Sequence, residues 1–333
     1  MESVARVIDL NVARNIEITE NKHEHLETKL DRFVTNIVSE EEYNEGNHFA
    51  DSLESIDDIN NMILALSKRD YSSMVLFIVG INTGYRPVDL LAWRWKHIVE
   101  NGKFLRTFAM PEHKTGKTAL VNLNETTIKI LTWFMEYKMC NEIDFSMENF
   151  VFSSMKNKGQ KTFLYLEKET NKMWHTNKAN AEKGLMYSFE NRKKIFREES
   201  TIVNDTEHYI KLRKPIDTDT ISKHLIKCAE TVGISGHFTS YTTRHTHSYW
   251  FATVAMDDPK FADIAKREMV TRLLSTHFNH SSTKITTDYY MRFESKAISG
   301  IVFELNLGKE AVDMIVNNYN EVKNDCGEQV CWL

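Results

Sequence analysis

The chain has 333 residues and a hydrophobic content of 41%, which is enough for a packed core and excludes a disordered tail. No stretch approaches the roughly 20 apolar residues of a membrane span, and the N-terminus lacks the features of a secretory signal. The four cysteines form no C-x-x-C pair and have no histidine cluster beside them, which indicates free thiols. We therefore expect a cytoplasmic globular protein.

The net charge of -5 hides an uneven distribution of charge along the chain. Residues 1–60 contain 15 acidic and 5 basic residues, whereas residues 156–214 contain 14 basic and 8 acidic residues. A basic stretch of this kind is compatible with contacts to nucleic-acid phosphates. A solvated charged surface has the same composition, so charge alone does not identify DNA as a partner.

Helical patterns dominate the first half of the chain. Residues 1–54 alternate short apolar groups with acidic runs, which indicates one or two helices in a short acidic segment. A helix is predicted to begin after Ser55, and a strongly apolar second helix to end at Gly84. A third helix is predicted over residues 87–98, with Pro87 near its start. Its expected core residues are Leu90, Leu91, Trp93 and Ile98.

The hydrophobic period then changes from helix to strand. Residues 104–110 and 118–123 predict two strands joined by a turn at Gly116, and a helix follows over residues 126–140. Residues 156–214 show only weak strand-like pieces, around residues 163–165, and no clear core pattern. A helix closed at Gly233 and a helical C-terminal half complete the chain. The sum predicts a mostly α fold with a small antiparallel β-sheet (α+β).

Several separated residues are candidates for chemistry. Tyr241 and Arg244 are three residues apart on a predicted helix and share a face, and a histidine precedes a tyrosine by nine residues. Arginines stabilise charge on phosphate oxygens, a cation can protonate a leaving alkoxide, and a phenol can attack phosphorus. Each residue alone has an ordinary structural explanation. The set that metal-free phosphoryl transfer would use is Arg86, Lys114, Tyr241, Arg244, His280 and Tyr289.

Two segments in the first half resemble motifs of the tyrosine recombinases, the group of phage integrases and the Xer and Cre proteins. The segment TGYRPVDLLAWRWKHI resembles the first box, TGxRxxE-L-x-x-L-x-W-x-D-I, with Arg86 at the catalytic arginine and Asp89 where glutamate is usual. HKTGKTALVNL resembles the β-hairpin that follows this box, with Lys114 at its lysine.

Two segments in the second half extend the resemblance in the family's order. SYTTRHTHSYWFAT resembles the second box, H-x-L-R-H-T, with Arg244 at the second catalytic arginine. FNHSSTKITTDYYMR resembles L-G-H-S-S-x-x-T-T-x-x-Y, with His280 at its histidine. Together the four motifs are far more specific than any one of them.

The resemblance implies a site-specific recombinase that cleaves and rejoins double-stranded DNA without metal or ATP. A tyrosine attacks the scissile phosphate and forms a 3′-phosphotyrosyl link, two arginines hold the phosphate, and His280 supports the transition state. Lys114 would protonate the 5′-oxygen. Family members act as tetramers on two DNA sites, which implies DNA and further copies of the chain as partners, and a location on cytoplasmic DNA or the nucleoid.

The chain departs from the family pattern at the second box. Tyr241 stands where histidine or lysine is usual, and a phenol cannot take up a proton near neutral pH as an imidazole can. The site would then depend more on Lys114, His280 or His245. Telomere resolvases, a related branch, also depart at this position.

The nucleophile is the second departure. Tyr289 has the family's spacing from its histidine, but alignment on the preceding Thr-Thr pair would select Tyr290. Two adjacent residues of a helix point about 100° apart, so only one of them can face the phosphate. The histidine spacing favours Tyr289, with Tyr290 as second choice.

Relative to the family, insertions are expected near residues 156–214 and 256–268. We predict a short acidic segment over residues 1–54, a catalytic domain over residues 55–300 and a C-terminal helical tail over residues 301–333. The family's DNA-clamping N-terminal domain has about 100 residues, so the first segment would be truncated or minimal. The tail would dock on a neighbouring protomer or pack against its own domain. The alternatives are a telomere resolvase or type IB topoisomerase-like enzyme, and a DNA-binding or assembly protein with impaired catalysis.

Overall fold

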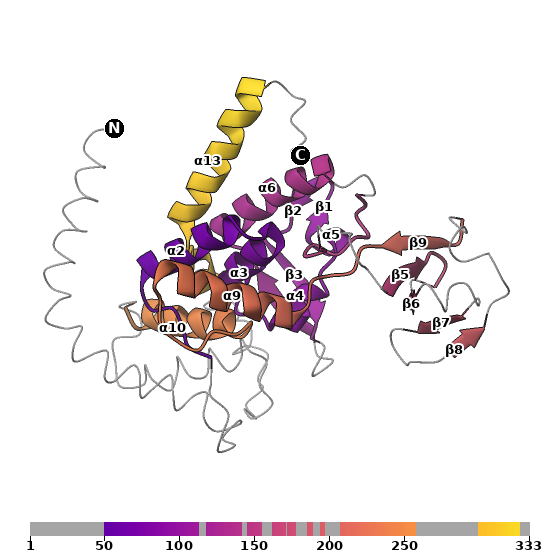
Figure 1. The fold of residues 1–333 in the computed structure, drawn as a ribbon, viewed down its shortest axis with the longest axis horizontal. Coiled ribbons are helices and arrows are strands. Elements are labelled where there is room, and N and C mark those ends of the chain that lie inside the picture. The colour runs from indigo at the N-terminus through magenta and orange to yellow at the C-terminus, as the bar shows by residue number, and fades with distance from the viewer. Residues whose placement is uncertain are drawn as a thin grey trace, which may run out of the picture. The chain divides into compact units, whose positions relative to one another are not determined.

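The structure is a computed structural model that describes residues 50–112, 118–141, 145–154, 162–170, 172–177, 185–188, 194–196, 207–257 and 299–326 (Figure 1). All of these residues belong to one compact unit that begins at Ala50. The predicted N-terminal segment therefore lies almost entirely outside the described residues, as does the predicted insertion at residues 256–268, apart from its first two residues.

Local capping residues define the ends of three helices as the sequence predicts. Helix α2 (Ile56–Ser67) begins after Ser55, whose side chain accepts a hydrogen bond from the backbone N–H of Asp58. Helix α3 (Tyr71–Thr83) ends at Gly84, which has a φ of 69°. Helix α9 (Thr218–Val232) begins after Asp217 and ends at Gly233. A side-chain acceptor at the start and a left-handed residue at the end satisfy backbone groups that a helix leaves open.

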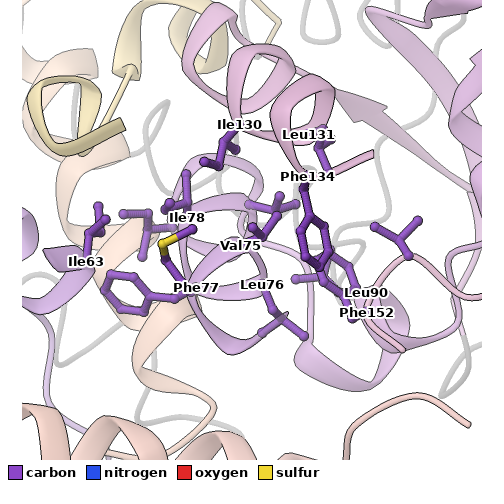
Figure 2. Close-up of a cluster of buried hydrophobic side chains, with 14 of the residues drawn as sticks. Ile63, Val75, Leu76, Phe77, Ile78, Leu90, Ile130, Leu131, Phe134 and Phe152 are labelled. Carbon is purple, nitrogen blue, oxygen red and sulfur yellow. The ribbon is translucent and has the colours of Figure 1, made fainter. Parts of the chain in front are cut away.

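Helix α3 lies at the centre of the hydrophobic core. Every residue from Ser72 to Thr83 is buried, and the helix packs against α2, α6 (Glu125–Asn141) and α10 (Thr242–Asp257). Figure 2 shows Val75 and Ile78 of α3 facing Ile130 and Phe134 of α6. A helix that is apolar on all sides is stable in water only when other elements cover all of its sides. This explains why the other helices pack around α3.

The prediction of one continuous third helix is wrong. The structure has two short helices, α4 (Pro87–Leu91) and α5 (Trp95–Ile98), separated by an extended Arg94 that forms a β-bridge with Phe150. Trp93 and Trp95 are both fully buried. Two residues that are two positions apart point about 200° away from each other on a continuous helix, so the break allows both indoles to enter the core. The four predicted core residues of this segment are all buried.

Two small hairpins follow. Strands β1 (Val99–Glu100) and β2 (Lys103–Phe104) form one, and β3 (Thr107–Pro111) and β4 (Thr118–Asn122) form the other. Both are antiparallel, as the sequence predicts for the second. Burial alternates along β3, with Phe108 and Met110 buried and Thr107 exposed. The buried face of β3 therefore points at the core beside Trp93, whose ring centroid lies 5.2 Å from that of Phe108.

A five-stranded antiparallel sheet occupies the segment in which the sequence shows only weak strand-like pieces. Its strands are β5 (Thr162–Glu167), β6 (Met173–Asn177), β7 (Leu185–Ser188), β8 (Lys194–Phe196) and β9 (Tyr209–Leu212), in the spatial order β8-β7-β6-β5-β9. A separate small core supports it, made of Phe150, Leu164, Leu166 and Leu212. The sheet thus has packing of its own.

The C-terminal helix α13 (Lys309–Cys326) packs against α2 and α6 of the same chain. The segment before it is held on α3, because the backbone N–H of Leu307 donates to Asn82 Oδ1 at 2.8 Å. Lys129 Nζ and Asp313 Oδ1 form an ion pair at 2.7 Å. Among the described helices, none is long and apolar enough to cross a membrane. The mostly α fold with small antiparallel sheets is confirmed.

Candidate active site

The turn after α3 places Arg86. Gly84 ends the helix in the left-handed region, where a residue without a Cβ carries little strain. Arg86 then adopts an extended conformation immediately before α4, and Pro87 starts that helix with its fixed φ. The guanidinium of Arg86 is largely buried, with 12% of the side chain exposed. The turn therefore fixes a buried cation at the C-terminal end of the central helix.

Arg244 reaches the same turn from α10. Its Nη1 donates a hydrogen bond to the carbonyl oxygen of Gly84 at 3.0 Å. One turn further along α10, a ring nitrogen of His247 lies 3.0 Å from the carbonyl oxygen of Ile81. These two contacts hold α10 against the C-terminal end of α3. The structure thus brings together Arg86 and Arg244, which belong to two distant motifs of the sequence.

Two carboxylates accompany the two arginines. Arg86 Nη1 lies 3.2 Å from Glu112 Oε1 and 3.9 Å from Asp89 Oδ2, and both acidic side chains are only 3% exposed. Charges in a protein interior need partners of opposite sign, because burial removes their hydration. The carboxylates are buried and the arginines partly exposed, so the four side chains form a largely buried cluster in which two positive charges are balanced by two negative ones.

Burial and mutual repulsion change the acid–base properties of this cluster. Burial, and then the charge of Arg86, lower the pKa of Arg244 to about 9, while Glu112 and Asp89 act in the opposite direction. The guanidinium is therefore still positively charged at neutral pH. Burial and the same two carboxylates raise the pKa of Tyr85, so this phenol stays protonated. A charged pair of arginines in a largely dry environment is well suited to hold an anion.

Tyr241 lies one turn before Arg244 and differs from the cluster in its exposure. The residue is 44% exposed, and it raises the pKa of Arg244 electrostatically. His245, the alternative that the sequence offers, follows Arg244 directly in α10 and is half-buried. Tyr241 therefore presents a phenol to solvent beside the second arginine, where it could donate a hydrogen bond to a bound anion.

Four of the predicted site residues lie outside the described residues: Lys114, His280, Tyr289 and Tyr290. Their roles remain predictions from the sequence. For the residues that the structure does describe, no group of three or more histidine, cysteine, aspartate or glutamate side chains is placed to hold a metal ion.

Glu112 is the residue that the sequence reasoning missed. It follows β3 directly, and the strand alternates between buried and exposed positions. Because side chains two residues apart share a face of a strand, Glu112 continues the buried face of Phe108 and Met110. The sequence contained a signal for Glu112: it is a charged residue at a position that the alternating pattern of β3 assigns to the core.

Comparisons with known proteins find likeness only at the level of structure. No family model matches the sequence, and no curated protein matches it. Among solved structures, XerA recombinase is 16% identical, with a TM-score of 0.41 over 83% of this chain and 66% of that one. A lambda integrase (75-356) dimer bound to a COC′ core site is 12% identical, with a TM-score of 0.38 over 75% of this chain and 65% of that one. The chain thus spans slightly less than two thirds of each structure.

Proposed function

We propose that the chain is a tyrosine-type DNA strand transferase of the tyrosine recombinase family, and that it acts as a site-specific recombinase or integrase. The observation that carries the proposal is the meeting of Arg86 and Arg244 at the Gly84 turn. Both were selected from sequence motifs, and the motifs themselves contain no information on distance.

A purely structural ion-pair network explains this arrangement less well. Two guanidiniums side by side repel each other, and Arg86 lowers the pKa of Arg244. A buried group of charges is also weak evidence for a role in stability, because well-packed apolar residues of similar volume often serve as well. Two arginines that converge at one turn instead fit an anion with several oxygens, such as the phosphate of a DNA backbone.

The proposed reaction uses these side chains in separate roles. Arg86 and Arg244 hold the non-bridging oxygens of the scissile phosphate and stabilise the charge that develops there. The phenol of Tyr289 loses its proton to solvent and its oxygen attacks phosphorus, which forms a 3′-phosphotyrosyl bond and breaks the bond between phosphorus and the 5′-oxygen, released as a 5′-hydroxyl. Lys114 donates the proton that the leaving 5′-oxygen requires, and His280 supports the transition state. The phosphodiester energy is kept in the new bond, so rejoining needs neither ATP nor a metal ion. Double-stranded DNA and a tetramer of the chain are the proposed partners.

The test is capture of the covalent intermediate. The purified chain is incubated with short duplexes that have a randomised centre and a nick, so that the cleaved fragment diffuses away and the adduct is trapped. SDS-resistant adducts are isolated and their DNA is sequenced. We expect adducts enriched in one sequence, and a loss of about 10²–10³-fold in the rate of adduct formation for Arg244→Gln. Absence of any adduct across the pool would refute the enzymatic function.

A further inference from the structure

Glu112 is a buried carboxylate whose position is set by the strand that precedes it. Strand β3 points alternate side chains into the core, and Glu112 continues that face with 3% of its side chain exposed. A charged group is rarely placed there for stability, because well-packed apolar residues often serve a buried position equally well. We therefore expect a nearby cation whose position or charge depends on Glu112.

Arg86 is one such cation. Glu112 Oε1 lies 3.2 Å from Arg86 Nη1, closer than Asp89 Oδ2 at 3.9 Å. The two contacts differ in origin. Asp89 is on the same short helix that Arg86 precedes, so it moves with the arginine, whereas Glu112 comes from a different element. The contact with Glu112 is an ion pair without hydrogen-bond geometry, and it holds the guanidinium near the β3–β4 hairpin.

The charge of Glu112 also reaches beyond Arg86. It raises the pKa of both Arg244 and Tyr85, and so favours the charged form of the second arginine. Glu112 thus reduces the repulsion that the two arginines would otherwise exert on each other.

We propose that Glu112 is a positioning residue for strand cleavage, which holds the guanidinium of Arg86 in the orientation that the scissile phosphate requires. This inference rests on the proposed function. Glu112 itself makes no contact with the phosphate in this account, because a carboxylate would repel it. Glu112 acts only by orienting the guanidinium of Arg86.

This role predicts opposite effects on binding and on chemistry. Without the charge of Glu112, the cluster becomes more positive, so affinity for DNA is maintained or increases. The arginine, however, loses its fixed orientation, and a misplacement of about 1 Å can reduce a rate about 10²-fold. A role that was merely structural would lower the fraction of active molecules and leave the rate constant of the remaining molecules unchanged.

The experiment compares three substitutions under single-turnover conditions with saturating nicked DNA. Glu112→Gln keeps the shape of the side chain and removes its charge, and Glu112→Asp keeps the charge. Glu148→Gln is the matched control, because Glu148 pairs with Arg94 at 3.0 Å and with Lys96 at 2.7 Å. The rate constant, the adduct yield and the dissociation constant for DNA are measured for each variant.

We expect Glu112→Gln to slow adduct formation about 10–100-fold without weakening DNA binding, Glu112→Asp to retain more of the rate, and Glu148→Gln to match the parent protein. A scissile methylphosphonate, in which a methyl group replaces a charged oxygen, reduces the need for the arginine. With this substrate the rates of the parent and Glu112→Gln should converge.

The outcomes separate the two proposals. If the parent forms no adduct, the proposed function fails. If the parent forms adduct and Glu112→Gln has the same rate constant, only the positioning role of Glu112 is refuted. The same holds if the defect of Glu112→Gln persists in full on the methylphosphonate.

Discussion

Gly80 of α3 and Thr243 of α10 lie closer together than two residues with side chains allow. A Cβ added to Gly80 would lie 2.7 Å from the Cβ of Thr243. This close approach brings the next residue, Arg244, within reach of the Gly84 carbonyl at the end of α3. The separation of two helices thus determines whether the two arginines of the site meet.

The substitution Gly80→Ala tests this contact. The added methyl group meets a Cβ rather than the flexible end of a side chain, so one helix must shift, and we expect a loss of about 1–3 kcal/mol in the free energy of unfolding. Urea denaturation measures it. Gly300→Ala is the control, because nothing lies within 4 Å of an added Cβ there. Equal stability of the two variants would show that α3 and α10 are not tightly packed.

The pairing of Arg86 with Glu112 gives a second prediction, on stability. Arg86→Met removes a cation that pairs with two buried carboxylates, and we expect a loss of about 3–5 kcal/mol. The double substitution Arg86→Met with Glu112→Gln removes both partners and should be destabilised by less than the sum of the two single changes. Chemical denaturation of all four proteins measures the difference. Effects that add to within about 0.5 kcal/mol would contradict a direct interaction.

The ends of helices α2, α3 and α9 can be predicted from the sequence because the residues that define them lie within a few positions of each end. Ser55, Asp70 and Asp217 each cap a helix through a residue three positions away, and Gly84 ends α3 through its own backbone. The break between α4 and α5 was not accessible in this way. It depends on the burial of both Trp93 and Trp95 in a core that distant segments build.

Of the sheet β5–β9, the sequence indicated only the strand around residues 163–165, which lies in β5, and the rest was missed for a related reason. Its strands have three to six residues, too few for an alternating pattern to emerge, and β5 pairs with β9 across a long stretch of chain. Strand pairing of this kind depends on tertiary contacts rather than on local propensity.

For the candidate site, motif resemblance selected Arg86 and Arg244, and the structure shows them at one turn. The resemblance did not select Glu112, because a motif records residue types at fixed spacings and Glu112 acts across two elements. Its position on the buried face of β3 was nevertheless readable from the alternation.

His97 gives a prediction on pH dependence. Burial, and then the neighbouring Arg94 and Lys96, lower the pKa of His97 from 6.5 to about 4. In the unfolded chain the imidazole binds a proton near pH 6.5, whereas in the folded protein it stays neutral down to about pH 4. The unfolded state therefore binds more protons between these values, and stability falls as the pH is lowered through this window.

Replacement of His97 by glutamine should reduce the dependence of stability on pH between 6.5 and 4. Urea denaturation at several pH values in this range measures the slope for both proteins. An identical slope in the variant would mean that His97 does not contribute, and that other groups account for any acid sensitivity.

The role proposed for Lys114 is testable through the leaving group. A 5′-bridging sulfur at the scissile position gives a thiolate, which leaves without a proton. We expect Lys114→Ala to slow cleavage of normal DNA by about 10²–10⁴-fold, the range of general acid catalysis, and to cleave the sulfur-containing DNA at nearly the parent rate. Cleavage kinetics on the two substrates measure this. A defect of equal size on both would assign Lys114 to phosphate binding instead.

The most direct test of the account is to identify the residue that becomes linked to DNA. The trapped adduct is digested with protease and nuclease, and mass spectrometry locates the residual nucleotide on the peptide. Tyr289→Phe and Tyr290→Phe are assayed in parallel. We expect a phosphotyrosyl bond at Tyr289, with adduct lost in Tyr289→Phe and kept in Tyr290→Phe. A bond at Tyr290 would overturn the assignment of the nucleophile, and a bond to any residue other than these two tyrosines would contradict the proposed chemistry.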